Sequence, residues 1–399
     1  MQSRVANPIR INSWLIASVL CINTFSKWLS VFVYIPFNIV LMETAVLLLL
    51  VLLNNGRVLL KQELIIILLV VAGIMGYSLI LWRFDSRVME RLLKFVMYAL
   101  FAMLCIQYPF DEKELLTAIC YIGIIHIAYL FLYAASQIKA GIMSVDNTMD
   151  LSYTSLIYLF ASAEIAGSKY ERKSNRLLAL MICAFVAYFI TVVSMNRGAL
   201  IAAASYFAFR VITSSKRLLL RVMCFIGVII AALIVYDNLI PILEAADEFA
   251  SSRGVVINPL RKTIQQMNYS DSMISGREAV YGAAVQMIKE TWALPNGVAS
   301  YHIQTNAAYY PHNIFLEACI EFGFVGIILV ALIILRACYF IVITPVRRSG
   351  IILMFFCMSI PRLMVSSSYW ENSYIWPLMM LLWSSEVLTY QKNNIQGFC

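Results

Sequence analysis

The chain has 399 residues, of which 62% are hydrophobic and 13% are charged, and its mean hydropathy is +0.81. This composition excludes an ordinary water-soluble protein, which needs far more charged surface, and it indicates an integral membrane protein. The net charge of +8 does not imply nucleic-acid binding, because the basic residues fall largely in short loops between apolar runs.

Apolar runs long enough to cross a bilayer, roughly 20 residues each, recur from one end of the chain to the other. We predict about twelve spans, with centres near residues 18, 42, 73, 100, 125, 159, 186, 206, 227, 328, 358 and 380. The expected fold is therefore an all-α polytopic membrane protein. Residues 1–236 hold the first nine spans, residues 237–311 form one large loop, and residues 312–399 hold the last three, together as a single membrane domain.

Basic residues in short loops predict the orientation of the spans, because such loops stay in the cytoplasm. Every second loop is basic, and both termini are therefore expected in the cytoplasm, with segments 195–198 and 237–311 on the outer side. One loop disagrees, since Arg83, Arg87 and Arg91 fall on the outer side, where Asp85 and Glu90 dilute their charge. The basic positions on the expected cytoplasmic side are Arg4, Arg10, Arg57, Lys61, Lys169, Arg172, Lys173, Arg176, Lys216, Arg217, Arg221, Arg347 and Arg348.

The nine cysteines do not form a disulfide or zinc pattern. None lies in the large loop, and eight lie in or beside apolar runs, where cysteine behaves as a small hydrophobic residue. The cysteines therefore indicate no metal site, and the chain is expected to need no cofactor.

The large loop is expected to be ordered in part. Ser275 can cap a helix that ends before the turn at residues 295–297. This helix would lie along the membrane surface or cover the end of the bundle. Its apolar positions recur at helical spacing and are Val280, Tyr281, Ala284, Met287 and Ile288.

Three residues expected on the outer side can form one site. Arg197 occupies a very short connection, Arg277 begins the loop helix, and His312 closes the loop where a hydrophobic helix starts. Arg253 is a weaker fourth candidate. Guanidinium groups bind phosphate oxygens bidentately, and a histidine can take the proton from a hydroxyl, so this set suits a phosphorylated lipid.

Each of these polar residues also has a structural interpretation. Arg197 can be an interfacial arginine that snorkels or caps a helix end, and His312 can simply cap the tenth span. His126, inside the fifth span, is more often a packed core histidine than a catalyst. Glu43 and Glu164 lie inside spans and mark either an ion path or hydrogen bonds within the bundle. His302 has no supporting context.

Two segments of the sequence follow a known family pattern. His312-Asn313, nine intervening residues, Gly323, two residues and Gly326 follow the H-N-x9-G-x-x-G pattern of ligases. Upstream, Ser275-Gly276-Arg277 is similar to the arginine that opens the family's loop helix. On these motifs the chain resembles the O-antigen ligase and polymerase superfamily, whose members are membrane glycosyltransferases that act on glycans linked to undecaprenyl diphosphate.

Two further segments of the sequence bear on this resemblance. Asn196-Arg197-Gly198-Ala199 resembles the S-R-G-A segment of the family, with Asn196 in place of a small Ser or Thr. At Pro295-Asn296-Gly297-Val298-Ala299, many relatives carry a second glycine that this chain lacks. The motifs span roughly residues 190–330, and the first 190 residues are similar to the family only in hydropathy.

The resemblance implies a fold of the GT-C-like type and a metal-independent, inverting glycosyl transfer at the periplasmic face of a bacterial inner membrane. In such a reaction His312 activates an acceptor hydroxyl, while Arg197 and Arg277, with Arg253 as the weaker candidate, bind the donor diphosphate. The implied partners are an undecaprenyl-diphosphate-linked donor, a lipid-linked acceptor, membrane lipids, and chain-length regulator and flippase proteins. Nucleic acid is not among them.

The acceptor divides the family into polymerases and ligases. Polymerases pass the glycan to another lipid-linked repeat unit, whereas ligases pass it to the lipid A core. Residues 311–317 and the late segment 368–372 (Ser-Tyr-Trp-Glu-Asn) look more similar to polymerases, so a polymerase is favoured and a ligase is the alternative. A lipid-linked sugar flippase or another transporter is the remoter alternative, against which the single large polar loop and the lack of matched halves argue.

Overall fold

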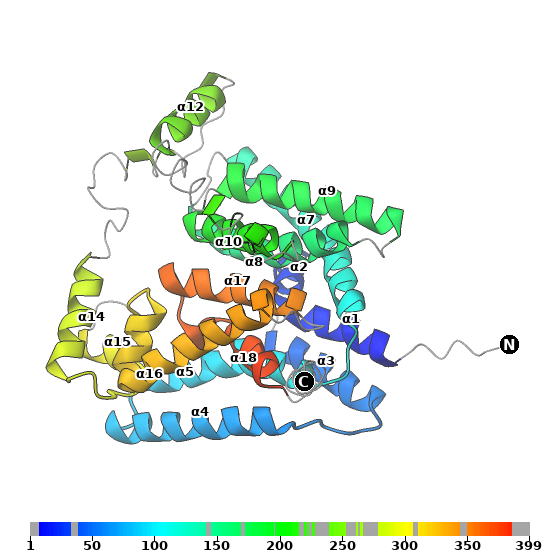
Figure 1. Cartoon of the computed structure of the whole chain (residues 1–399). Helices are drawn as coiled ribbons and strands as arrows, with labels where there is room; N and C mark the ends of the chain where they lie inside the picture. Colours follow the sequence, from blue (N-terminus) through cyan, green and yellow to red (C-terminus); the bar gives the residue numbers. More distant parts are fainter. Residues whose placement is uncertain are drawn as a thin grey trace.

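The computed structural model describes residues 8–32, 39–140, 145–168, 172–194, 196–214, 219–221, 223, 226–227, 239–252, 261, 264–265, 278–305, 310–343 and 349–384. Within these ranges the regular structure is entirely helical, which confirms the all-α class (Figure 1).

Helices lie at every predicted span centre in the described ranges. The centre near residue 227 falls in a stretch of which only isolated residues are described. Several spans combine two or three consecutive helical segments, as where α5 continues through the π-helical turn η1 into α6. The segments at these positions are α1 (Pro8–Leu20), α2 (Ile22–Phe32), α3 (Ile39–Leu53), α4 (Gln62–Leu81), α5 (Ser86–Phe95), η1 (Val96–Leu100), α6 (Phe101–Cys105), α7 (Glu112–Ala140), α8 (Val145–Gly167), α9 (Lys173–Tyr188), η2 (Phe189–Ser194), α10 (Arg197–Ser214), α16 (Ile314–Cys338), η3 (Tyr339–Ile343), α17 (Ser349–Val365) and α18 (Ile375–Trp383).

Four helices are long and apolar enough to cross a membrane by length and composition: Gln62–Leu81, Glu112–Leu132, Lys173–Thr191 and Ile314–Val342. Three shorter apolar helices accompany them, at Ile39–Leu53, Gly198–Thr213 and Ser349–Val365. Only 22% of the most apolar stretch of α4 is buried inside the protein, and Leu69 and Ile80 are 67% and 75% exposed. Such apolar outer faces suit lipid rather than water, and the chain is a multi-pass membrane protein.

Segments far apart in sequence meet at one end of the bundle. Arg10 at the start of α1 pairs with Glu114 at the start of α7, with Nε and Oε2 3.2 Å apart. The Asn12 side chain donates to the carbonyl of Pro109 at 3.0 Å, and the Tyr108 hydroxyl donates to the carbonyl of Arg57 at 3.1 Å. Arg10 and Arg57, both assigned to the cytoplasmic side from the sequence, therefore lie near each other.

The opposite end gathers the turn between α4 and α5 with part of the large loop. The Trp82 indole donates to the carbonyl of Asn296 at 3.0 Å, and the Arg87 guanidinium donates to the carbonyls of His302 and Ile303 at 3.4 and 3.3 Å. Arg87, one of the three arginines that disagreed with the charge rule, thus lies at the same end as the loop and binds its backbone.

The loop carries α12 (Leu239–Ser252), α14 (Glu278–Glu290) and α15 (Ser300–Thr305), the last two beside the start of α16 (Figure 1). The expected loop helix is α14, although its proposed cap, Ser275, lies outside the described residues. Ala284 and Met287 are buried against Tyr301 and Ile320. Because these contacts join α14 to α15 and α16, α14 covers the end of the bundle.

A break at Gly323 divides α16 and fixes the turn that precedes α15. Gly323 adopts φ 66° and ψ −153°, outside the helical region. The carbonyls of Ile320 and Glu321 instead accept the N–H groups of Asn296 and Gly297, each at 3.1 Å. A Cβ at Gly323 would overlap the carbonyl oxygen of Ala293, so glycine is required for both the backbone angle and the close approach.

Candidate functional site

His312 lies immediately before α16, at the end of the bundle that holds the loop. The side chain of Asn313 caps the helix by accepting the N–H groups of Phe315 and Leu316 at 2.9 and 3.3 Å. Since Asn313 makes the cap, His312 is not needed for that role. His312 itself has φ 55°, a left-handed conformation that is uncommon for a residue with a side chain.

Two tyrosines hold the His312 segment in this conformation. The Tyr310 and His312 rings meet edge to face, with centroids 4.5 Å apart. From α14, the Tyr281 hydroxyl donates to the carbonyl of His312 at 3.4 Å. The first contact bears on the imidazole ring and the second on the backbone, and neither uses the imidazole nitrogen atoms.

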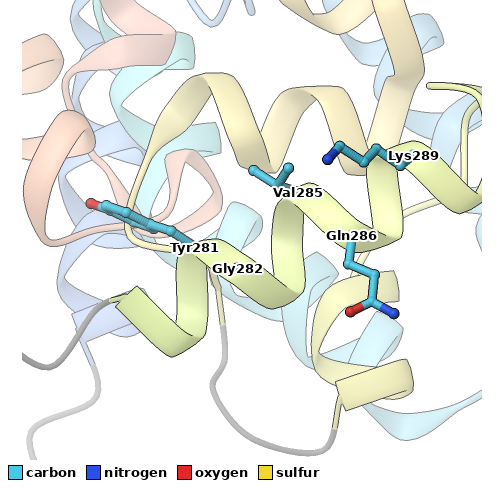
Figure 2. Close-up of a pocket in the computed structure, with 5 residues that line it drawn as sticks. All are labelled: Tyr281, Gly282, Val285, Gln286 and Lys289. Atoms are coloured by element: carbon cyan, nitrogen blue, oxygen red, sulfur yellow. The ribbon is translucent and has the colours of Figure 1, made fainter.

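Tyr281 also lines an open groove of about 580 Å³ along α14. Figure 2 shows Tyr281 and Gln286 projecting in different directions from the helix, with Val285 between them in the sequence. Tyr281 therefore both lines the groove and contacts the backbone of His312.

Tyr310 connects His312 to the end of α17. Its hydroxyl donates to the carbonyl of Ser366 at 2.8 Å. Burial raises the pKa of Tyr310 to about 12, with Glu371 and Glu317 acting in the same direction and the two arginines Arg362 and Arg91 acting against it. The phenol is therefore protonated at neutral pH and is a donor.

The start of α10 packs against Tyr153, which is linked to Tyr310 through Ser366. The Tyr153 hydroxyl and the Ser366 hydroxyl are hydrogen-bonded at 2.6 Å. A Cβ at Gly198 would overlap the Tyr153 hydroxyl and lie 3.1 Å from Val365, so the helix start is seated closely on α8 and α17. The Asn196 side chain caps α10, accepting the N–H groups of Gly198 and Ala199 at 2.9 and 3.2 Å.

Within the described ranges, three cationic side chains and one carboxylate lie around the connected residues His312, Tyr310, Ser366 and Tyr153. Arg91 is 2% exposed; it pairs with Glu371 at 3.2 Å, and its guanidinium carbon lies 5.9 Å from the centroid of the Tyr310 ring. Lys94 also pairs with Glu371, at 2.6 Å. The guanidinium carbon of Arg362 lies 4.4 Å from the centroid of the Tyr153 ring.

The predicted site residues are described to different extents. His312 is described in full. Arg197 begins α10, but its side chain lies outside the described set, and Arg253 and Arg277 lie outside the described residues altogether. A chain of contacts through Tyr310, Ser366 and Tyr153 thus links His312 to the start of α10, where Arg197 lies.

Two buried carboxylates on the first part of α16 hold the surrounding loops. Glu317 accepts the Ser368 hydroxyl at 2.5 Å. Glu321 accepts the N–H of Ala299 and the indole of Trp370, each at 2.9 Å, and also the Tyr369 hydroxyl. These bonds fix the late Ser-Tyr-Trp-Glu-Asn segment against the helix that follows His312.

His126 and Glu164, two other polar residues singled out in the sequence, have structural roles. His126 is buried, lies 2.8 Å from the Ser155 hydroxyl and stacks on Tyr158 at 4.6 Å, so it is a packed core histidine. Glu164 accepts the Tyr206 hydroxyl at 2.5 Å and pairs with Arg210, which favours hydrogen bonding within the bundle over an ion path.

Glu43 is buried on α3, and its Oε2 has no hydrogen-bond partner within the described part of the chain. His302, on α15, lies near Arg87 and Arg91, and burial together with these charges lowers its pKa. No cluster of three or more His, Cys, Asp or Glu side chains that could hold a metal ion occurs in the described ranges.

Sequence reasoning missed Tyr153, Tyr310, Arg91 and Arg362. A signal existed for two of them. Arg91 belongs to the loop that disagrees with the charge rule, and Arg362 is an arginine inside an apolar run, where a charge is costly and usually has a function. The tyrosines gave no signal, because aromatic residues are common throughout such spans.

The site and fold define a multi-pass helical membrane protein with a polar, arginine-rich site at one end of its bundle. Residues 178–331 match a family model described as O-antigen ligase, and the chain carries a domain of that family over this segment. Enzymes of the family transfer glycans and take lipid-linked glycan substrates. No curated protein and no solved structure matches the chain significantly.

Proposed function

We propose that this protein is an O-antigen polymerase that joins undecaprenyl-diphosphate-linked repeat units at the periplasmic face of the inner membrane. The observation that carries the proposal is the group around His312. A histidine held by tyrosines, two capped helix starts and two arginines, Arg91 and Arg362, converge at one end of the bundle, with His312 inside the matched segment.

The chemistry follows from the residue types. His312 takes the proton of an acceptor sugar hydroxyl as its oxygen attacks the anomeric carbon of the donor glycan. The bond from that carbon to the diphosphate oxygen breaks, with inversion, and undecaprenyl diphosphate leaves. Arg197 and Arg277, with Arg253 as the weaker candidate, bind the diphosphate and stabilise its growing negative charge. No cofactor takes part in this scheme.

The proposed topology has about twelve spans, with both termini in the cytoplasm and residues 237–311 as a periplasmic loop between residues 1–236 and 312–399. The positions of Arg10 and Arg57 at one end, and of the loop at the other, support this orientation. Arg87 and Arg91 do not argue against it, because both bind protein groups at the loop end.

A polymerase is favoured over a ligase by two segments that resemble polymerases in sequence and contact each other in space. Residues 311–317 and 368–372 meet through the hydrogen bond between Glu317 and Ser368. A ligase that transfers the glycan to lipid A core is the second candidate, because both classes share the His312 motif. Chain-length regulator and flippase proteins are the expected protein partners.

The test supplies purified protein in lipid with a lipid-linked repeat unit, with and without lipid A core. We expect a ladder of lipid-linked polymer without lipid A core. Glycan found only on lipid A core would identify a ligase. Movement of the lipid-linked unit across a vesicle membrane without any new glycosidic bond would instead identify a transporter.

A further inference from the structure

Arg362 differs from the other cations of the site, because its guanidinium makes no ion pair within 4 Å in the described ranges, although its charge is felt by Asp150. Arg91 and Lys94 share Glu371. Lys27 pairs with Asp150 at 2.6 Å. Within the described part of the chain, Arg362 makes no ion pair, and its Nε is buried without a hydrogen-bond partner.

An arginine whose buried N–H group has no acceptor, near the end of an apolar helix, lowers the stability of the fold. A guanidinium carries five N–H donors, and a buried donor without an acceptor lowers the stability of the fold. Charged residues in membrane helices therefore usually serve a ligand or a pathway. The sequence directly before Arg362 is apolar apart from Ser359, so Arg362 does not belong to a basic loop.

Tyr153 orients this guanidinium. An arginine stacked on a ring uses its flat face, which leaves the N–H donors along its edge free for an anion. The Tyr153 hydroxyl is bound by Ser366, one helical turn after Arg362. Ser366 in turn accepts the Tyr310 hydroxyl on its carbonyl, and Tyr310 supports His312. Arg362 therefore belongs to the group that joins His312 to the start of α10.

We propose that Arg362 binds phosphate oxygens of the donor diphosphate from the α17 side, with Tyr153 as the surface that fixes the guanidinium plane. This inference rests on the proposed glycosyl transfer and adds a substrate-binding residue to it. A diphosphate carries several negative oxygens, and the fork of one more arginine matches a pair of them.

The test compares Arg362 with Arg336, a matched arginine on a membrane helix. Arg336 also stacks on aromatic rings, at 5.1 Å from Phe340 and 5.2 Å from Trp383, but its Nε donates to the carbonyl of Leu382 at 2.8 Å. Purified wild type, Arg362→Ala, Arg362→Lys and Arg336→Ala are placed in phosphatidylcholine nanodiscs. Their affinities for undecaprenyl diphosphate and undecaprenyl monophosphate are then measured.

We expect Arg362→Ala to bind undecaprenyl diphosphate about 10- to 100-fold more weakly, as for a lost charge-assisted hydrogen-bonded pair. Arg362→Lys should recover only part of this loss, because lysine lacks the planar fork. The affinity for the monophosphate should fall less, and Arg336→Ala should bind as wild type does. Arg362→Gln, which keeps most of the chain length, replaces Arg362→Ala if the alanine protein does not fold.

Two outcomes separate this inference from the proposed function. If wild type does not bind undecaprenyl diphosphate, the proposed function is wrong, and this inference falls with it. If wild type binds it and the Arg362 variants bind within threefold, only the role of Arg362 is overturned. A phospholipid headgroup is the other source of phosphate, so binding of phosphatidylglycerol added to the nanodiscs is measured as well. Loss of that lipid alone would make Arg362 a headgroup anchor and overturn the proposal.

Discussion

The Tyr310 ring meets the His312 ring edge to face with their centroids 4.5 Å apart, while the Tyr310 hydroxyl is bound to α17 through Ser366. Tyr310 thus links the end of α17 to the His312 imidazole. Because the ring of Tyr310 contacts His312 directly, we expect the ring to matter more than the hydroxyl for the position of His312.

Substitutions at Tyr310 should separate these two contributions. Tyr310→Phe keeps the ring and loses one hydrogen bond, a loss of about 1 kcal/mol, so kcat should fall by no more than about tenfold. Tyr310→Ala should lower kcat further while changing the KM for donor little. The steady-state kinetics of both proteins measure this. A Tyr310→Phe protein as impaired as Tyr310→Ala would assign the support to the hydroxyl instead.

Replacement of His312 should separate chemistry from binding. His312→Ala should lower turnover by about 10²- to 10⁴-fold, the usual value of general-base assistance. Donor affinity and folding should be retained, because Asn313 caps α16. Asn313→Ala serves as the structural control and should lower stability by about 1 kcal/mol. Turnover of His312→Ala within a few-fold of wild type would leave His312 with a structural role only.

The loop arginines are expected to recognise the diphosphate through their planar fork. Arg277→Lys should therefore be much more impaired in glycan transfer than a neutral surface change, although its charge is kept. Transfer assays at matched expression provide the comparison, with Lys289→Arg on α14 as a neutral control. Full transfer by both Arg197→Ala and Arg277→Ala would show that these residues only anchor the protein at the interface.

Glycine should be indispensable at the break in α16 but not on the lipid-facing α4. Gly323→Ala forces a Cβ onto the Ala293 carbonyl and a positive φ on alanine, and Gly326→Ala places a Cβ against the Ala318 carbonyl. The backbone conformation at Gly323 alone costs roughly 1–3 kcal/mol for alanine, and at both positions a backbone carbonyl must move, so both proteins should unfold at lower temperature. Gly73→Ala and Gly76→Ala, where a Cβ meets nothing within 4 Å, should be neutral or stabilising. Thermal unfolding in detergent measures all four.

Labelling in a cysteine-free background should establish the orientation. A cysteine at Ser270 should react with an impermeant reagent from the periplasm, and one at Asn55 should react only after the inner membrane is breached, because the loops alternate in charge. The reverse pattern would contradict both the orientation and the periplasmic site.

The sequence determined the membrane class, the positions of the described apolar helices, the loop helix and the places of the His312 and Gly323 motifs at the start of α16 and at its break. These features are local. A span is identified from some twenty consecutive apolar residues, and an N-cap such as Asn313 acts within one turn. Alternating basic loops also correctly grouped Arg10 with Arg57 at one end of the bundle.

Only the tertiary structure decided which residues surround His312. Tyr153 and Ser366 lie 213 positions apart in the sequence, yet their hydroxyls are hydrogen-bonded. Arg91, Arg362 and Tyr310 likewise come from three separate segments. In a helix bundle the apolar stripes that pack together are nearly uniform in composition, so hydropathy does not specify which helices are neighbours. Side-chain packing and the hydrogen bonds of buried polar groups select the arrangement, and that arrangement places Arg91 and Arg362 against tyrosines that are linked to His312.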